Sequence, residues 1–68
     1  MGNGVRATRQ ARRLTQKALA QAVGVRPTMI SEIEHDRTYP SVPVLLRLIR
    51  ALQCDLHDLY WLPDERGA

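Results

Sequence analysis

The chain reads Leu14-Thr15-Gln16-Lys17-Ala18-Leu19-Ala20-Gln21-Ala22-Val23-Gly24-Val25 through its most informative stretch. Thr15 is suited to the N-cap of a helix, because its hydroxyl can accept a bond from an N–H group of the first turn. Gly24 is suited to the position after the last turn, where the left-handed conformation costs glycine little. Between them, three apolar residues share one face of a helix: Leu19, Ala20 and Val23. The stretch therefore predicts a helix over residues 16–23 that ends in a tight turn.

A second helix is predicted to begin at Pro27, because proline at the first helical position presets φ and costs no hydrogen bond. It runs to about residue 35, and its predicted buried face holds Met29, Ile30 and Ile33. The link between the two helices is only Gly24-Val25-Arg26. A tight turn that contains glycine between two short helices is typical of the helix-turn-helix motif.

Three more helices are predicted around this pair. The first runs from Val5 to Arg13 and is rich in Arg, Ala and Gln. Another follows a Ser41 cap and extends to about Leu52, with a broad apolar stripe of Val42, Leu45, Leu46, Leu48, Ile49 and Leu52. The last is predicted over Leu56–Leu62, with Asp55 as its cap. No stretch alternates with the two-residue period of a strand, so we expect an all-α, compact bundle of five short helices.

Length and charge suggest one small domain with two different faces. The 68 residues suffice for a single domain, which we assign to residues 5–62, with flexible ends at 1–4 and 63–68. Residues 1–50 hold nine Lys/Arg against three Asp/Glu, whereas residues 51–68 hold one against four. A basic body suits a polyanion, and the acidic end suits another contact. A domain this small is marginally stable, and dimerisation is one remedy.

Several function classes are disfavoured by the residues present. His35 and His57 have no Cys or carboxylate set at metal-ligand spacing, and the sequence holds no phosphate loop, catalytic carboxylate pair or nucleophile elbow. No apolar run reaches the roughly 18 residues of a membrane span. Residues 5–13 are polar where a secretory signal is apolar, and Cys54 has no partner for a disulfide. We therefore expect a cytoplasmic protein that is not an enzyme, has no cofactor, metal or small-molecule ligand, and does not bind membranes.

The opening stretch resembles the Cro- and phage-repressor-like helix-turn-helix family of transcriptional regulators, whose pattern is LTQ-x-x-LA-x-x-x-GV. The similarity continues through Ile30-Ser31-Glu32-Ile33-Glu34, Pro40-Ser41 and Asp55–Leu59, and covers about residues 5–62. It is specific because spacing is kept across several separate elements. The resemblance implies a lambda-repressor-like fold and a homodimer that binds a palindromic double-stranded DNA operator, with the helix over residues 27–35 in the major groove.

The resemblance also implies which side chains contact DNA. Base contacts are expected from residues at the start and on the outer face of the recognition helix: Arg26, Pro27, Thr28, Ser31 and Glu32. Phosphate contacts are expected from Gln16, Lys17, Arg37, Thr38 and Arg13, with Arg6 and Arg12 as further candidates. A largely buried ion pair between Arg9 and Glu34 is expected to tie the first helix to the end of the recognition helix. The chain departs from the family where Arg13 replaces a common glycine and Arg26 replaces a common Ser or Thr cap.

Three large residues in a row cannot all face one small core, and Tyr60-Trp61-Leu62 is such a run. Either two pack inward and one is exposed, or the run forms a patch that pairs with its copy across a twofold axis. We favour the second interpretation and predict a dimer interface of Leu56, Tyr60, Trp61 and Leu62. The alternative function is a protein-interaction module, or an antitoxin-like partner binder, with the same fold. It would tend to place apolar residues at Thr28, Glu32 and His35, and these are polar.

Overall fold

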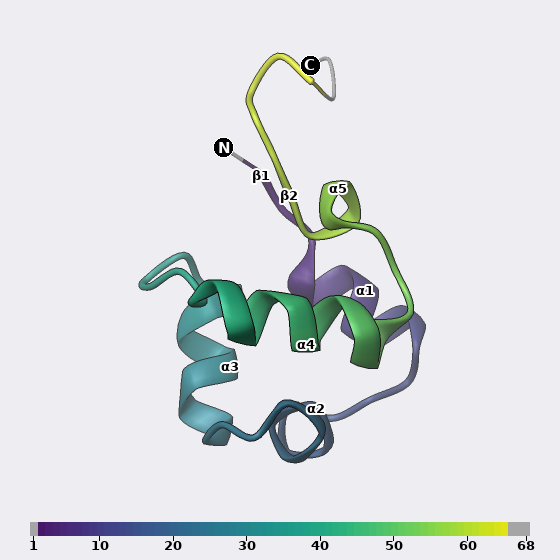
Figure 1. Cartoon of the computed structure of the whole chain (residues 1–68), viewed down its shortest axis with the longest axis vertical. Coiled ribbons are helices and arrows are strands. Elements are labelled where there is room, and N and C mark those ends of the chain that lie inside the picture. Colours follow the sequence, from purple (N-terminus) through teal and green to yellow (C-terminus); the bar gives the residue numbers. More distant parts are fainter. Residues whose placement is uncertain (1, 66–68) are drawn as a thin grey trace.

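A computed structural model describes residues 2–65, which fold into five helices and one short pair of strands (Figure 1). The helices are α1 (Val5–Ala11), α2 (Gln16–Val23), α3 (Pro27–Glu34), α4 (Val42–Leu52) and α5 (Leu56–Leu59). The strands are β1 (Gly2–Asn3) and β2 (Tyr60–Trp61). The predicted bundle of five short helices is confirmed. None of the helices within residues 2–65 is long and apolar enough to span a membrane.

Short polar side chains and one glycine set the helix boundaries. Thr15 accepts a hydrogen bond from the Ala18 N–H at 3.0 Å, and Ser41 accepts one from the Val44 N–H at 3.3 Å. Gly24 ends α2 with φ 76° and ψ 34°, in the left-handed region. Each cap satisfies a backbone group that the helix itself leaves without a partner. The boundaries of α2 therefore follow directly from the local sequence.

All five helices contribute to one apolar core. Its fully buried members are Val5, Leu19, Ala20, Val23, Ile30, Ile33, Leu48, Leu52 and Leu59. Ala20 has 0% exposure. A small residue there lets α2 and α3 approach closely. The tight packing of this pair sets the angle at which α3 leaves the turn.

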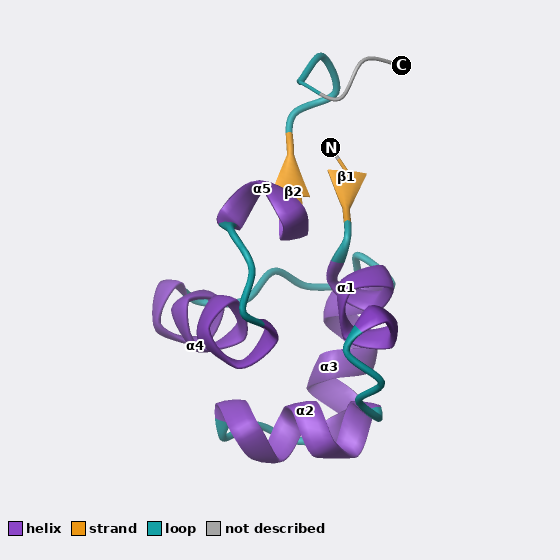
Figure 2. Ribbon diagram, turned by 90° about the vertical axis from the view of Figure 1, so that its right-hand side faces the viewer, coloured by secondary structure: helices purple, strands orange, loops and turns teal. Residues whose placement is uncertain are grey.

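The two strands were not expected from the sequence. Tyr60 and Trp61 leave the helical conformation after α5 and pair antiparallel with Asn3 and Gly2, so the predicted helix over residues 56–62 ends at Leu59 instead (Figure 2). A Cβ at Gly2 would overlap the Trp61 indole ring, so the close approach of β1 requires glycine there. Gly2 and Asn3 thus join the fold although we had assigned residues 1–4 to a flexible end. The last three residues of the predicted 63–68 tail lie outside the described residues.

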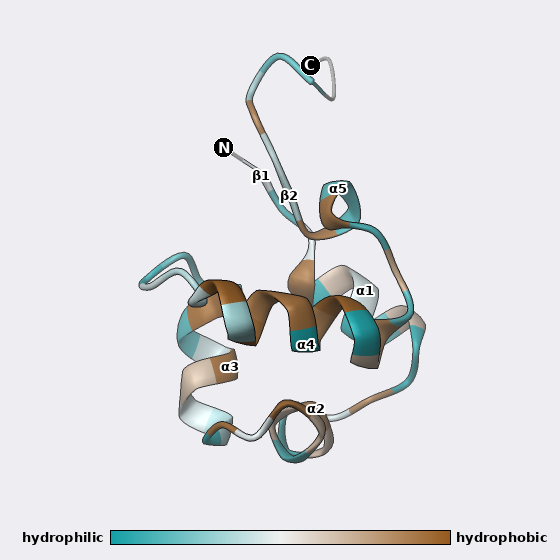
Figure 3. Ribbon diagram, in the orientation of Figure 1, coloured by the Kyte–Doolittle hydropathy of each residue, from teal (hydrophilic) through white to brown (hydrophobic). Residues whose placement is uncertain are grey.

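Three residues predicted to be buried lie on the surface. Met29, Val42 and Leu46 are 39%, 69% and 60% exposed. The apolar arc of α4 is wider than the area that its neighbours cover, and hydrophobic residues colour several turns of this helix in Figure 3. The periodicity identified the helices correctly but overestimated the width of their buried faces.

Candidate nucleic-acid interface

Helix α3 presents a polar face at one edge of the molecule, and no other element lies on its outer side in Figure 1. Ile30 and Ile33 point inward and are fully buried. Thr28 and Glu32 are exposed, and Ser31 is half-buried. Thr28 and Glu32 are four positions apart, so they project from the same side of the helix. Three of the five predicted base-contacting residues therefore share one accessible or partly accessible surface.

The first turn of α3 adds an exposed cation and an exposed proline. Arg26 occupies the N-cap position with φ −78° and ψ 148°, and its side chain makes no capping hydrogen bond. Pro27 follows, and it has no N–H group that would need a partner. The missing cap costs about 1 kcal/mol. Arg26 is exposed, so its guanidinium is accessible to a ligand at the start of the helix.

The start of α2 lies against the end of α3. Gln16 Nε2 donates to Glu34 Oε1 at 3.1 Å, and Gln16 is half-buried, whereas Lys17 is exposed. The side-chain amide that was predicted to contact phosphate is therefore engaged within the protein. The first backbone N–H groups of a helix have no intrahelical acceptors, and they can still bind an anion there.

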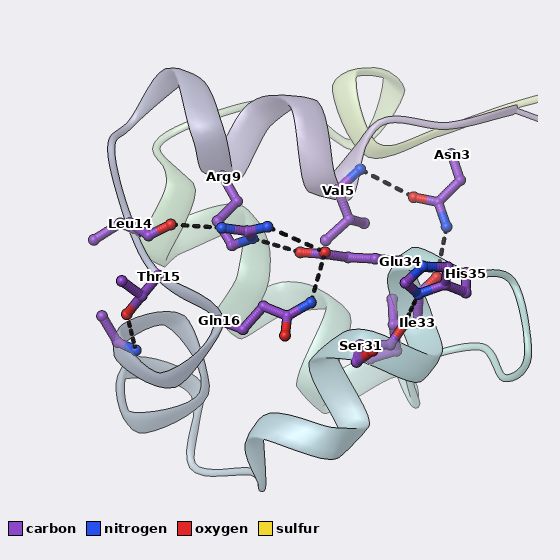
Figure 4. A network of polar contacts seen from close by, with 11 residues as sticks. Asn3, Val5, Arg9, Leu14, Thr15, Gln16, Ser31, Ile33, Glu34 and His35 are labelled. Carbon is purple, nitrogen blue, oxygen red and sulfur yellow. Dashed lines mark hydrogen bonds and ion pairs between the residues drawn. The ribbon is translucent and has the colours of Figure 1, made fainter.

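A nearly buried ion pair holds three elements together (Figure 4). Arg9 Nε donates to Glu34 Oε2 at 2.6 Å, and Arg9 Nη2 donates to Glu34 Oε1 at 3.3 Å. Arg9 Nη1 also donates to the Leu14 carbonyl oxygen at 2.7 Å. The two side chains are 11% and 1% exposed. With Gln16 as a further donor, the Glu34 carboxylate anchors α1, the start of α2 and the end of α3 to one another.

The loop between α3 and α4 carries two more predicted contacts. Asp36 reverses the chain with φ 58°, and the Arg37 N–H donates to the Glu32 carbonyl at 2.9 Å. Arg37 is exposed and Thr38 is half-buried. The loop projects beside the end of α3 in Figure 1. It therefore places a cation next to the polar face of α3.

Two neighbouring arginines after α1 have different environments. Arg12 donates from Nε to the Leu52 carbonyl at 2.8 Å and from Nη2 to the Gln53 carbonyl at 2.9 Å, so it caps the end of α4. This structural role replaces the phosphate contact that was considered for it. Arg13 is exposed and adopts φ 57°, which explains why glycine is common at this position in the family that the chain resembles. Helix α1 ends at Ala11 with Arg12 as its C-cap, two residues before the predicted boundary at 13.

The four residues of the predicted dimer interface line one shallow apolar hollow in the acidic C-terminal part of the chain. Leu56, Tyr60, Trp61 and Leu62, with His57 and Glu65, surround about 170 Å³. Leu56 and Leu62 are 45% and 55% exposed, whereas Tyr60 and Trp61 are half-buried. Leu56 and Tyr60 also line a second apolar hollow of about 190 Å³, with Tyr39, Pro40 and Leu45. These hollows leave an apolar surface next to the strand pair.

Tyr60 connects this apolar surface to the loop after α3. Its ring meets the ring of Tyr39 edge to face, with centroids 6.1 Å apart. Its hydroxyl is buried without a hydrogen-bond partner among the described residues. Burial is the main cause that raises the pKa of Tyr60 to about 12, and the nearby Asp36 and Tyr39 contribute smaller parts of this increase. The neutral form of the Tyr60 phenol is thus strongly favoured where its ring meets Tyr39.

A model of the helix-turn-helix family matches residues 5–59. The chain is 43% identical to repressor protein C2 of Salmonella phage P22 over 54 residues, and these residues make up 79% of this chain. It is 38% identical to multiprotein-bridging factor 1 of Candida albicans over 52 residues, and these residues make up 76% of this chain. The chain spans only 25% and 34% of the length of these two relatives.

A solved structure is similar in fold as well as in sequence. It is the crystal structure of the P22 c2 repressor in complex with a synthetic operator, determined in the presence of Tl⁺. The two folds superpose with a TM-score of 0.74 and 40% sequence identity, over 76% of this chain and 79% of the repressor chain.

Proposed function

This chain belongs to the helix-turn-helix family, and on that premise we propose that it is a transcriptional regulator that binds double-stranded DNA sequence-specifically. The observation that carries the proposal is the polar outer face of α3, anchored from behind by the buried Ile30 and Ile33. The similar P22 repressor was crystallised on an operator. A helix of this kind enters the major groove, where each base pair presents its own pattern of donors and acceptors.

Base readout is assigned to the exposed start and outer side of α3. Arg26 suits guanine O6 and N7, Thr28 suits the thymine methyl group, and Glu32 suits the amino group of cytosine. Ser31 and Pro27 complete the contact surface. Glu32 also repels phosphates, so its contribution is to base discrimination and not to overall affinity.

Phosphate contacts are assigned to the elements that flank α3. Lys17 and Arg37 supply exposed positive charge, Thr38 supplies a hydroxyl, and Arg13 adds a cation at the turn before α2. Because the Gln16 side chain is bonded to Glu34, the contribution of Gln16 is assigned to its backbone N–H at the start of α2. These contacts fix the register of the protein on DNA without reading sequence.

We further propose that the regulator acts as a homodimer joined through the hollow around Leu56, Tyr60, Trp61 and Leu62. An exposed apolar patch at the acidic end of a small basic domain is suited to self-association across a twofold axis. Two recognition helices would then meet successive major grooves about 34 Å apart on a palindromic operator.

Selection of bound sequences from a randomised duplex pool tests the proposed function. We expect an enriched palindrome whose half-sites lie about one helical turn apart, bound with an affinity that falls steeply with salt. Binding without enrichment of any sequence would contradict the proposal, because phosphate contacts alone give nonspecific affinity.

The Glu32→Ala variant tests the assignment of base readout. Removing the carboxylate should relax the preference at one operator position by about 1–3 kcal/mol, because cytosine loses its acceptor. The selected sequences of Glu32→Ala and of Gln10→Ala, a control on the exposed side of α1, are compared with those of the wild type. Equal preferences in all three proteins would remove Glu32 from the contact set.

The alternative is a module that binds a protein partner with the same fold. The similarity to a multiprotein-bridging factor keeps this candidate open. The exposed residues Thr28 and Glu32 and the exposed His35 favour DNA, because a protein-binding face would tend to be apolar at these positions. An absence of any selected DNA sequence would shift the assignment to this alternative.

A further inference from the structure

The side-chain amide of Asn3 joins three separate elements, and Figure 4 shows two of its contacts, those with Val5 and Ile33. Its Oδ1 accepts from the Val5 N–H at 2.9 Å, at the first turn of α1. Its Nδ2 donates to the Ile33 carbonyl at 2.6 Å, in the last turn of α3, and to Asp36 Oδ1 at 2.9 Å, at the start of the following loop. The contacts with Ile33 and Asp36 cross 30 and 33 residues of sequence. One amide therefore connects the N-terminal strand to the end of the recognition helix.

The same loop is also held at its other end. The Tyr39 ring packs against the Tyr60 ring, and Tyr60 is the strand partner of Asn3 across the β1–β2 pair. Two paired residues of the short sheet thus hold residues 36 and 39. Arg37 and Thr38, the proposed phosphate contacts of this loop, lie between the two anchors.

The conformation of the loop needs such support. Asp36 adopts φ 58°, which is an unfavourable region for a residue with a side chain. The Asn3 amide donates both to the Asp36 carboxylate and to the Ile33 carbonyl, which also accepts from the Asp36 N–H at 3.2 Å, and these bonds favour this turn over alternatives. A loop that is already ordered loses less conformational entropy when it binds, so its contacts contribute more to affinity.

We propose that Asn3 is a positioning residue that holds the Asp36–Tyr39 loop in the conformation in which Arg37 and Thr38 meet the DNA backbone. This inference rests on the proposed DNA-binding function. Asn3 itself touches no DNA in this scheme and acts through the loop. The role was hidden in the sequence because residues 1–4 carry no periodic pattern.

The first test is Asn3→Asp, which keeps an acceptor for the Val5 N–H but replaces the donor with a carboxylate that faces Asp36. We expect binding to the selected operator to weaken about tenfold at 0.15 M salt, with a salt slope shallower by about one phosphate contact. The base preferences of the selected sequence should not change, because α3 keeps its own anchors. Gln10→Glu adds the same charge on the exposed side of α1 and should bind like the wild type.

Two further variants separate positioning from general loss of stability. In Asn3→Asp/Asp36→Asn the donor and the acceptor of the bond between residues 3 and 36 change places, while the bond to the Ile33 carbonyl is still lost, so the affinity and the salt slope should return in part. In an Arg37→Ala background, Asn3→Asp should have much less effect on affinity, because the contact that it positions is already absent. A purely structural role would give the same loss in both backgrounds and would overturn the proposal.

The hydrogen-exchange rate of the Arg37 amide measures how well the loop is ordered in the absence of DNA. This N–H donates to Glu32, and Asn3→Asp should accelerate its exchange while the core amide of Leu19 stays protected. Unchanged exchange at Arg37 would overturn the inference whatever the DNA results. Wild-type affinity and slope in Asn3→Asp would overturn the inference and leave the proposed function intact, whereas a wild type that selects no operator would overturn both.

Discussion

The recognition side, formed by α2 and α3, and the C-terminal side, formed by α5 and β2, differ in how completely they bury their apolar residues. On the recognition side, Leu19, Ala20, Val23, Ile30 and Ile33 are buried, and Met29 is the large apolar residue that is exposed, at 39%. On the C-terminal side only Leu59 is buried, while Leu56 and Leu62 are 45% and 55% exposed. The recognition side packs most of its apolar residues against the core and exposes polar groups that can contact a ligand. The second side leaves apolar surface uncovered, as expected of a face that meets a partner.

The largest effect should come from breaking the ion pair that holds the recognition side together. Glu34→Ala leaves the nearly buried Arg9 guanidinium without its carboxylate, and we expect it to lower the free energy of unfolding by about 3 kcal/mol. The double variant Arg9→Ala/Glu34→Ala should be more stable than Glu34→Ala, because it leaves no buried charge. Urea denaturation monitored by circular dichroism measures both. A double variant less stable than Glu34→Ala would contradict this expectation and show that Arg9 stabilises the fold without Glu34, through its bond to the Leu14 carbonyl.

The C-terminal side is tested by placing a charge on its apolar surface. Leu62→Asp should weaken dimerisation at least tenfold, because burying an unpaired carboxylate costs more than 1 kcal/mol. The matched control is Leu46→Asp on α4, since Leu46 is 60% exposed and Leu62 is 55% exposed. Sedimentation equilibrium should show monomers for Leu62→Asp and dimers for Leu46→Asp. Equal dissociation constants would place the interface elsewhere.

One substitution can be made on both sides at residues that share a conformation. Arg13 precedes α2 with φ 57°, and Gln53 follows α4 with φ 51°. Glycine at either position should raise the free energy of unfolding by about 1 kcal/mol, because it adopts positive φ without steric cost. Thermal unfolding measures this gain. Arg13→Gly should also weaken DNA binding through loss of a cation, whereas Gln53→Gly should not, and equal affinities would exclude Arg13 from the phosphate contacts.

The last test concerns the pH dependence of stability at Tyr60, where β2 meets the loop after α3. The pKa of Tyr60 is raised from 10.0 to about 12, so the folded state favours the neutral phenol. The resulting stabilisation is fully present below pH 10 and is lost as the pH rises through about 12. Tyr60→Phe removes this group and should flatten the decline in stability over that range. Identical pH profiles for both proteins, measured by chemical denaturation, would contradict the assignment.

The two sides also differ in how well the sequence predicted them. Helix α2 begins and ends where Thr15 and Gly24 indicated, because caps act on backbone groups within four residues. The end of α5 was predicted three residues too late. The helical conformation at Tyr60 and Trp61 loses to pairing with Asn3 and Gly2, which lie 57 and 59 residues away in sequence. No local pattern reports such a pairing.

In the candidate site, too, the sequence predicted some features and missed others. Spacing and resemblance identified the outer face of α3, because helical periodicity determines which side chains share a surface. They did not show that Gln16 turns to Glu34 or that Arg12 caps α4. Long polar side chains choose among several partners within reach, and the choice depends on where other helices lie.

The sequence by itself determined the five helices, the tight turn at Gly24 and the polar outer face of α3. These features rest on caps, glycine conformation and apolar spacing, which act within a few residues. Only the tertiary structure decided that Asn3 reaches the end of α3, that β1 pairs with β2, and that Val42 and Leu46 remain exposed. Each of these depends on how much of an element its distant neighbours cover, and that quantity exists only once the helices have packed.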